Sequence, residues 1–98
     1  MDCQTVGFTI EFDWVDKFKE GIGQALAYSA NDIGRDRKPG VVLICQRWNG
    51  EQLDLNHCQR RYESTLAIFA YHNIDARVWL CPYKAEALFE CAWKGSLD

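Results

Sequence analysis

Residues 9–28 read Thr-Ile-Glu-Phe-Asp-Trp-Val-Asp-Lys-Phe-Lys-Glu-Gly-Ile-Gly-Gln-Ala-Leu-Ala-Tyr, and this stretch decides the fold because it predicts a strand that runs directly into a helix. Side chains alternate between the two faces of a strand. Glu11 and Asp13 therefore share one face, whereas Ile10 and Phe12 point to the other. The strand is expected to deliver a pair of carboxylates to one side of a sheet.

The helical half of the stretch has one apolar and one polar stripe. The apolar stripe repeats every four residues and should face the core; it consists of Trp14, Phe18, Ile22 and Leu26. The polar stripe steps by three or four residues; it consists of Asp13, Lys17, Glu20, Gln24 and Tyr28. Two acids on a strand, followed by an amine and an amide on a helix, are suited to binding a divalent cation and a phosphate.

Simpler roles remain open for these residues. Asp13 is well placed to cap the start of the helix with its carboxylate. Lys17 and Glu20 fit a solvated helix face equally well, where ion pairs contribute little to stability. Gly21 and Gly23 each cost about 1 kcal/mol relative to alanine in a helix. We therefore expect another element to pack closely against the helix backbone at these glycines.

The order of the predicted elements indicates an α/β layer fold. Strands are expected at residues 1–5, 8–12, 41–45 and 76–81, and helices at residues 13–30 and 54–72. Residues 84–93 fit a helix or a strand, and their alanine, glutamate and leucine content favours a helix. Residues 1–98 are thus predicted to form a single domain, with a mixed four-stranded sheet flanked by two main helices.

Charge and cysteine usage limit the classes of function. The formal net charge of −3 argues against general polyanion binding, so any contact with nucleic acid should be local and assisted by a cation. Five cysteines are dispersed without a Cys-x-x-Cys pair, which predicts buried free thiols in a reducing cytoplasm. We find no leader segment and no apolar run that could span a bilayer, so we expect a cytoplasmic protein.

The motifs of the first half resemble a nuclease superfamily. Asp-Cys-x-Thr and Ile-Glu-Phe-Asp-Trp precede Asp-Lys-Phe-x-Glu-x-Ile-Gly-Gln-Ala-Leu-x-Tyr and Lys-Pro-Gly-Val-Val-Leu-Ile. These motifs resemble small bacterial proteins of the PD-(D/E)XK, restriction-endonuclease-like superfamily over residues 2–44, and residues 45–82 agree in the order of elements. The resemblance implies a restriction-endonuclease-like core, here lacking the leading helix and strand, and metal-dependent cleavage of DNA phosphodiesters.

The resemblance also implies which side chains would bind the metal. Asp2 would be the first acid of the motif and Glu11 the second. Both would bind Mg²⁺ or Mn²⁺ together with Asp13. Asp13 stands where the usual lysine of the superfamily would be, so the lysine's role would pass to Lys17 on the helix.

The helix that follows would support this site. Lys17 would position the attacking water or the phosphate. Gln24 with Tyr28 resembles the Gln-x-x-x-Tyr helix of the RecB-like branch, which lies beside the site, and Glu20 would support the same face. The catalytic set implied by the resemblance is therefore Glu11, Asp13, Lys17 and Gln24.

Further polar residues are weaker candidates. Arg35, Arg37 and Lys38 form a basic loop that could contact phosphates, although a solvated loop is the alternative. His57 and His72 lie near the ends of the second predicted helix, and we expect structural roles for both.

A second hypothesis is a catalytically inactive homodimer that uses the same groove for a ligand or a partner protein. The acidic net charge and the missing strand lysine favour it. A short chain with four tryptophans is expected to cover apolar surface by self-association. Trp14, Trp79 and Trp93 are the candidates for that contact.

Overall fold

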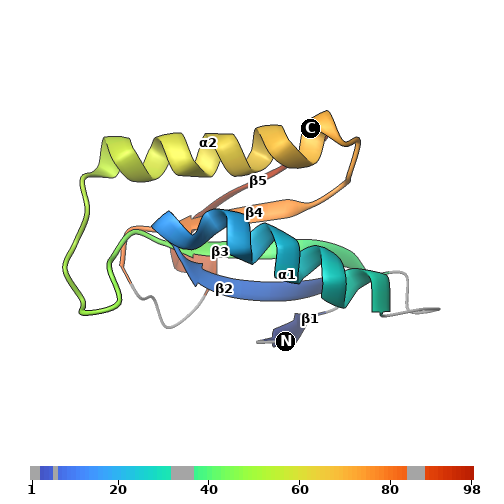
Figure 1. Cartoon of the computed structure of the whole chain (residues 1–98), viewed down its shortest axis with the longest axis horizontal. Helices are drawn as coiled ribbons and strands as arrows, with labels where there is room; N and C mark the ends of the chain where they lie inside the picture. The colour runs from blue at the N-terminus through green and yellow to red at the C-terminus, as the bar shows by residue number, and fades with distance from the viewer. Residues whose placement is uncertain (1–2, 6, 32–36, 84–87) are drawn as a thin grey trace.

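The computed structural model describes residues 3–5, 7–31, 37–83 and 88–98, with the backbone alone for residues 3–5 and 31. Within these residues the strands form one five-stranded sheet in the order β1-β2-β3-β4-β5 (Figure 1). They are β1 (Cys3–Thr5), β2 (Phe8–Trp14), β3 (Lys38–Ile44), β4 (Arg77–Cys81) and β5 (Ala92–Gly95). β2, β3 and β4 run parallel, and β1 and β5 pair antiparallel at the edges. The predicted α/β class with a mixed sheet is confirmed.

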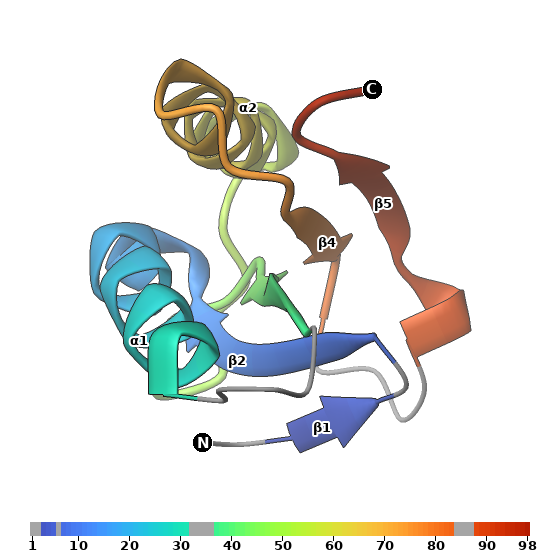
Figure 2. The same ribbon diagram turned by 90° about the vertical axis from the view of Figure 1, so that its right-hand side faces the viewer.

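Helices α1 (Phe18–Asn31) and α2 (Leu55–Tyr71) cover the same face of the sheet (Figures 1 and 2). Each helix links two neighbouring parallel strands, as expected of β–α–β crossovers. The core between the helices and the sheet is apolar; it includes Phe18, Ile22, Ala25, Val41, Leu43, Tyr62, Phe69 and Val78. The predicted apolar stripe of α1 thus faces the core, apart from Trp14, which belongs to β2. No helix among the described residues is long and apolar enough to cross a membrane.

The opposite face of the sheet carries a smaller apolar cluster. Ile10, Val42 and Trp79 are buried there, beneath the segment that contains the 3₁₀ turn η2 (Leu88–Glu90). The Trp79 ring lies over Gly40, where a Cβ would come within 3.1 Å of it. This packing explains why a glycine precedes the apolar run of β3.

The two long helices begin differently. Asp54 caps α2, and its carboxylate accepts a hydrogen bond from the His57 N–H at 3.4 Å. The predicted cap at Asp13 is wrong, because β2 continues to Trp14 before the 3₁₀ turn η1 (Val15–Lys17) begins. Asp13 accepts a hydrogen bond from the adjacent Trp14 N–H at 3.0 Å instead. The Asp13 carboxylate is therefore a strand side chain on the helix-covered face.

The helix favoured for residues 84–93 is also corrected. Residues 84–87 lie outside the described part, residues 88–90 form a single 3₁₀ turn, and Ala92–Gly95 is strand β5. Trp93 pairs with Trp79 of β4 in the antiparallel register. Helix propensities differ by only a few tenths of a kcal/mol for most residues, so pairing with a free sheet edge overrides them.

Two disulfide bonds among the described residues correct the prediction of free thiols. Cys45 at the end of β3 bonds to Cys58 in the first turn of α2, with 5.7 Å between the Cα atoms. Cys81 at the end of β4 bonds to Cys91 just before β5, with 4.6 Å between the Cα atoms. Both distances lie within the normal range for disulfides. The fold brings together cysteines that the sequence disperses, which spacing alone could not predict.

Candidate functional site

The ends of the parallel strands converge at one edge of the molecule. β2 leads into η1 and α1 there, and β3 leads through Cys45 to the loop before α2. Ligand sites in open α/β sheets are commonly at the carboxyl ends of parallel strands. We therefore searched this edge for convergent polar groups, beginning with the acids of β2.

Glu11 and Asp13 lie on the helix-covered side of β2, as the alternation predicted. Their register partners are Val41 and Leu43 of β3, which belong to the core beneath the helices. Glu11 is only 5% exposed, and Asp13 is half-buried at the carboxyl end of the strand. Asp13 also lines a hollow of about 200 Å³ at this end. Glu11 thus lies in the interior of the sheet, and Asp13 lies at its edge.

Helix α1 approaches these acids at Gly21. A Cβ built on Gly21 would lie 3.4 Å from both Asp13 Cβ and Asp13 Oδ2, and 3.5 Å from Val41 Cγ1. The predicted close approach is therefore confirmed for Gly21. It is wrong for Gly23, whose Cβ would meet no described heavy atom within 4 Å. Because Gly21 has no side chain, the Asp13 Oδ2 atom lies next to the backbone of α1.

The predicted helix residues flank this point of approach. Lys17, Gln24 and Tyr28 are four residues before, three after and seven after Gly21, so they share its side of the helix. Gln24 is exposed and Tyr28 is partly buried. The Lys17 ammonium pairs with the Glu20 carboxylate at 3.7 Å, and both side chains are more than half exposed. Helical spacing thus puts these residues on one side of the helix, and within the described residues the ion pair of Lys17 is with Glu20.

The other predicted residues lie elsewhere. Asp2 and Arg35 are outside the described residues. Lys38 pairs with Asp75 at 2.6 Å at the amino end of β3, opposite the edge where Asp13 lies. The Arg37 backbone carbonyl, in the same region, accepts a hydrogen bond from Ser29 Oγ at 3.1 Å. The Arg37 backbone and the Lys38–Asp75 ion pair thus lie at the amino end of the parallel strands, away from Asp13.

The acid pair fits the oxygen chemistry of a hard cation. Mg²⁺ is usually bound by one or two carboxylates, with water and substrate phosphate completing its shell. Glu11 and Asp13 supply two carboxylates on the same face of β2. In the part of the chain described here, no group of three His, Cys, Asp or Glu side chains could bind a metal.

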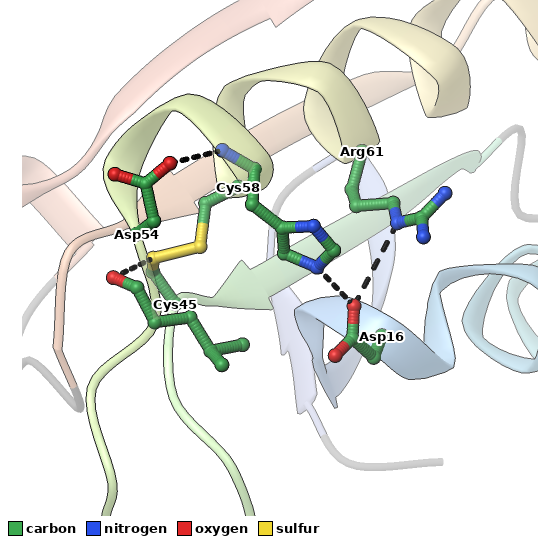
Figure 3. The surroundings of a disulfide bond; sticks show 7 residues. Asp16, Cys45, Asp54, Cys58 and Arg61 are labelled. Carbon is green, nitrogen blue, oxygen red and sulfur yellow. Dashed lines mark hydrogen bonds and ion pairs between the residues drawn. A yellow bond between two sulfur atoms is a disulfide. The ribbon is translucent and has the colours of Figure 1, made fainter.

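Sequence reasoning missed a second polar cluster at the same edge. Asp16 Oδ1 lies 2.5 Å from His57 Nε2 and 3.6 Å from Arg61 Nε, joining η1 to α2 (Figure 3). The cluster borders a hollow of about 390 Å³. Its lining residues are Asp16, Lys17, Phe18, Lys19, Glu20, His57 and Arg61. The spacing of four between His57 and Arg61 was a visible signal, but nothing in the sequence placed Asp16 opposite them.

Comparison with protein-family models, with curated proteins and with solved structures yielded no match.

Proposed function

We propose that the protein is a nuclease-like domain of the PD-(D/E)XK type that cleaves DNA phosphodiesters with Mg²⁺ or Mn²⁺. The observation that supports this best is the acid pair of β2 beneath α1. Glu11 and Asp13 share one side of the strand, and Gly21 of α1 lies against the Asp13 side chain. A packing or capping role alone would not require two successive acids on the covered face of a strand.

Glu11 is a buried acid on this strand. Its side chain is 5% exposed and has an interaction within the fold, which offsets part of the cost of burying a carboxylate. Thr9, two residues earlier on the same side of β2, is also fully buried. The helix-covered side of β2 is therefore a polar strip next to the apolar strands β3 and β4. Buried acids in such surroundings are more common at functional sites than in cores.

The proposed roles follow from these positions. Glu11 and Asp13 would bind the ion, which supplies charge stabilisation at the phosphate and a more acidic bound water. Asp2 would assist them. Lys17 would position the attacking water or the phosphate, and its side chain is more than half exposed. Gln24 and Tyr28 would support the substrate along the same side of α1.

A plasmid-nicking assay tests this function. Wild-type protein should nick supercoiled DNA with Mg²⁺ or Mn²⁺ and stop when the metal is chelated. Glu11→Gln and Asp13→Asn should each lower the rate by about a hundredfold or more, because each removes a metal-binding charge. Glu90→Gln is the matched control, since Glu90 is an exposed acid on η2. Equal nicking by wild type and Glu11→Gln would show a contaminant and refute the proposal.

A catalytically inactive homodimer is the second candidate, and one observation favours it. Several large apolar side chains near the end of the chain are exposed; they include Tyr83, Phe89, Trp93 and Leu97. Phe89 is 90% exposed and Trp93 is 49% exposed. Trp79 is buried, so the prediction that it contributes to a dimer contact is wrong. Sedimentation should then show a dimer at micromolar concentration that Phe89→Glu dissociates. A monomer for the wild type would remove this candidate.

A cytoplasmic location remains a proposal, and the disulfide bonds weigh against it. Cytosolic thiols are kept reduced, so stable disulfides are typical of oxidising compartments. Both bonds involve buried cysteines, Cys45–Cys58 and Cys81–Cys91.

A further inference from the structure

We infer that the hollow between the first turns of α1 and α2 binds a phosphate group. Under the proposed function, on which this extension rests, the group is a backbone phosphate of the DNA other than the one at the acid pair. The hollow has a volume of about 390 Å³, within the usual range of ligand pockets. It lies at the carboxyl edge of the parallel strands, the same edge as Asp13.

The lining of the hollow has three cationic side chains and two carboxylates. Lys17, Lys19 and Arg61 are permanent cations, and Asp16 and Glu20 are the acids that face them. Glu20 pairs with Lys17, and Asp16 lies near Arg61. Within the described residues, Lys19 has no carboxylate partner and contacts only the Phe18 ring, at 6.0 Å from its centroid. An anion is the ligand that this excess of positive charge would attract.

Asp16 arranges two of the phosphate donors. Its Oδ1 atom contacts His57 Nε2 and Arg61 Nε, which come from successive turns of α2. In Figure 3 the Arg61 side chain meets Asp16 through Nε, at 3.6 Å, and its two outer guanidinium nitrogens lie beyond that atom. A guanidinium bound to a carboxylate through Nε keeps its outer donors for a second oxyanion, and phosphate accepts such paired donors well. Asp16 therefore orients Arg61 through Nε and leaves the two outer nitrogens of Arg61 to donate to a phosphate.

Two further contacts fix the donors before a ligand arrives. The Arg61 guanidinium lies 5.6 Å from the centre of the Phe18 ring, a cation–π distance. The Cys45–Cys58 disulfide ties the first turn of α2 to the end of β3, directly beside His57. Donors that are already in place lose less entropy on binding. Exposed ion pairs alone contribute little to stability, so this arrangement is not required by the fold.

Two measurements without divalent metal test the inference. The first is a titration of wild-type protein with inorganic phosphate, followed by amide and side-chain NMR signals. The second is the affinity for a short labelled DNA duplex, measured by anisotropy in EDTA. Lys19→Met and Arg61→Met are the test variants. Arg60→Met and Lys94→Met are their matched controls, because both residues are exposed and neither lines the hollow.

Phosphate should shift the signals of Lys19, His57 and Arg61 selectively. Each test variant should weaken DNA binding about five- to tenfold and lower the slope of affinity against salt by about one, as expected for one lost phosphate contact. The control variants should match wild type. Lys19→Met keeps the inference testable if Arg61→Met unfolds, because Lys19 is an exposed side chain.

The outcomes separate this inference from the proposed function. Phosphate shifts with unchanged DNA affinity in both test variants would support the phosphate site and assign it to a small phosphate compound. Absent shifts, together with test variants that bind DNA like their controls, would overturn the inference even if DNA is nicked. A protein that never nicks DNA but shows the expected shifts and affinity losses would refute the nuclease and leave the phosphate site standing.

Discussion

Gly21 and Gly23 are two residues apart in α1, and only Gly21 lies against another element. Glycine costs a helix about 1 kcal/mol relative to alanine, largely through backbone entropy. Gly23→Ala should therefore raise the free energy of unfolding by about 0.5–1 kcal/mol, because its Cβ would enter open space. Gly21→Ala should gain less, since its methyl group would touch Asp13 and Val41.

Urea unfolding of both variants measures this difference. The same methyl group would place apolar carbon beside the Asp13 carboxylate, so Gly21→Ala should also weaken the response to metal, while Gly23→Ala should not. Equal stability gains and equal metal responses would mean that Asp13 does not lie against Gly21.

Tyr62 is the residue whose ionisation should affect stability. Burial against the core raises the pKa of its phenol above the ordinary value of 10.0. A raised pKa in the folded state means that the unfolded chain loses the proton first. The contribution of Tyr62 to stability is therefore complete below pH 10 and is lost as the pH rises through the folded-state pKa.

Tyr62→Phe should flatten the fall in unfolding free energy above pH 10, whereas Tyr71→Phe, which alters an exposed ring, should leave it unchanged. Parallel alkaline curves for wild type and Tyr62→Phe would contradict this.

At the scale of elements, the start of α2 is fixed by its cap. Asp54 accepts a hydrogen bond from the third residue of the helix, His57. Asp54→Ala should lower the free energy of unfolding by about 1 kcal/mol, the usual value for an aspartate cap. Asn56→Ala, an exposed change in the same turn, is the control. Equal free energies of unfolding for the two variants in denaturant titrations would show that Asp54 does not stabilise the start of α2.

The elements themselves were largely predictable because their signals are local. Alternation identified β2, the apolar run identified β3 as a central strand, and helical periodicity identified α1 and α2. The errors occurred where tertiary contacts decide the structure. Asp13 continues a strand paired with β3 instead of capping a helix, and residues 92–95 pair with β4 instead of joining a helix.

In the molecule as a whole, the two disulfides determine how many cysteine thiols are free to react. Alkylation of denatured protein without reductant should label one cysteine of five, Cys3, because Cys45, Cys58, Cys81 and Cys91 are bonded. Alkylation after reduction should label all five. Mass spectrometry counts the labels. Five labels without reductant would show that the purified chain is fully reduced and would favour the cytoplasmic location.

The candidate site was predictable only in part. The shared face of Glu11 and Asp13 follows from strand alternation, and Gly21 from the cost of glycine in a helix. The side on which Lys17 and Gln24 lie follows from helical spacing, but not the pairing of Lys17 with Glu20. The hollow around Asp16, His57 and Arg61 depends on where α2 packs across the sheet, which no local pattern encodes.

The central claim is that the acids of β2 bind a divalent cation beside Gly21. A titration of the folded protein with Mn²⁺, followed by amide NMR, tests it most directly, because the paramagnetic ion broadens only nearby signals. The amides of Trp14 and Gly21, which adjoin the Asp13 carboxylate, should broaden first, and Glu11→Gln and Asp13→Asn should abolish the effect. Broadening that is absent at millimolar Mn²⁺, centred elsewhere, or unchanged in both variants would contradict the account.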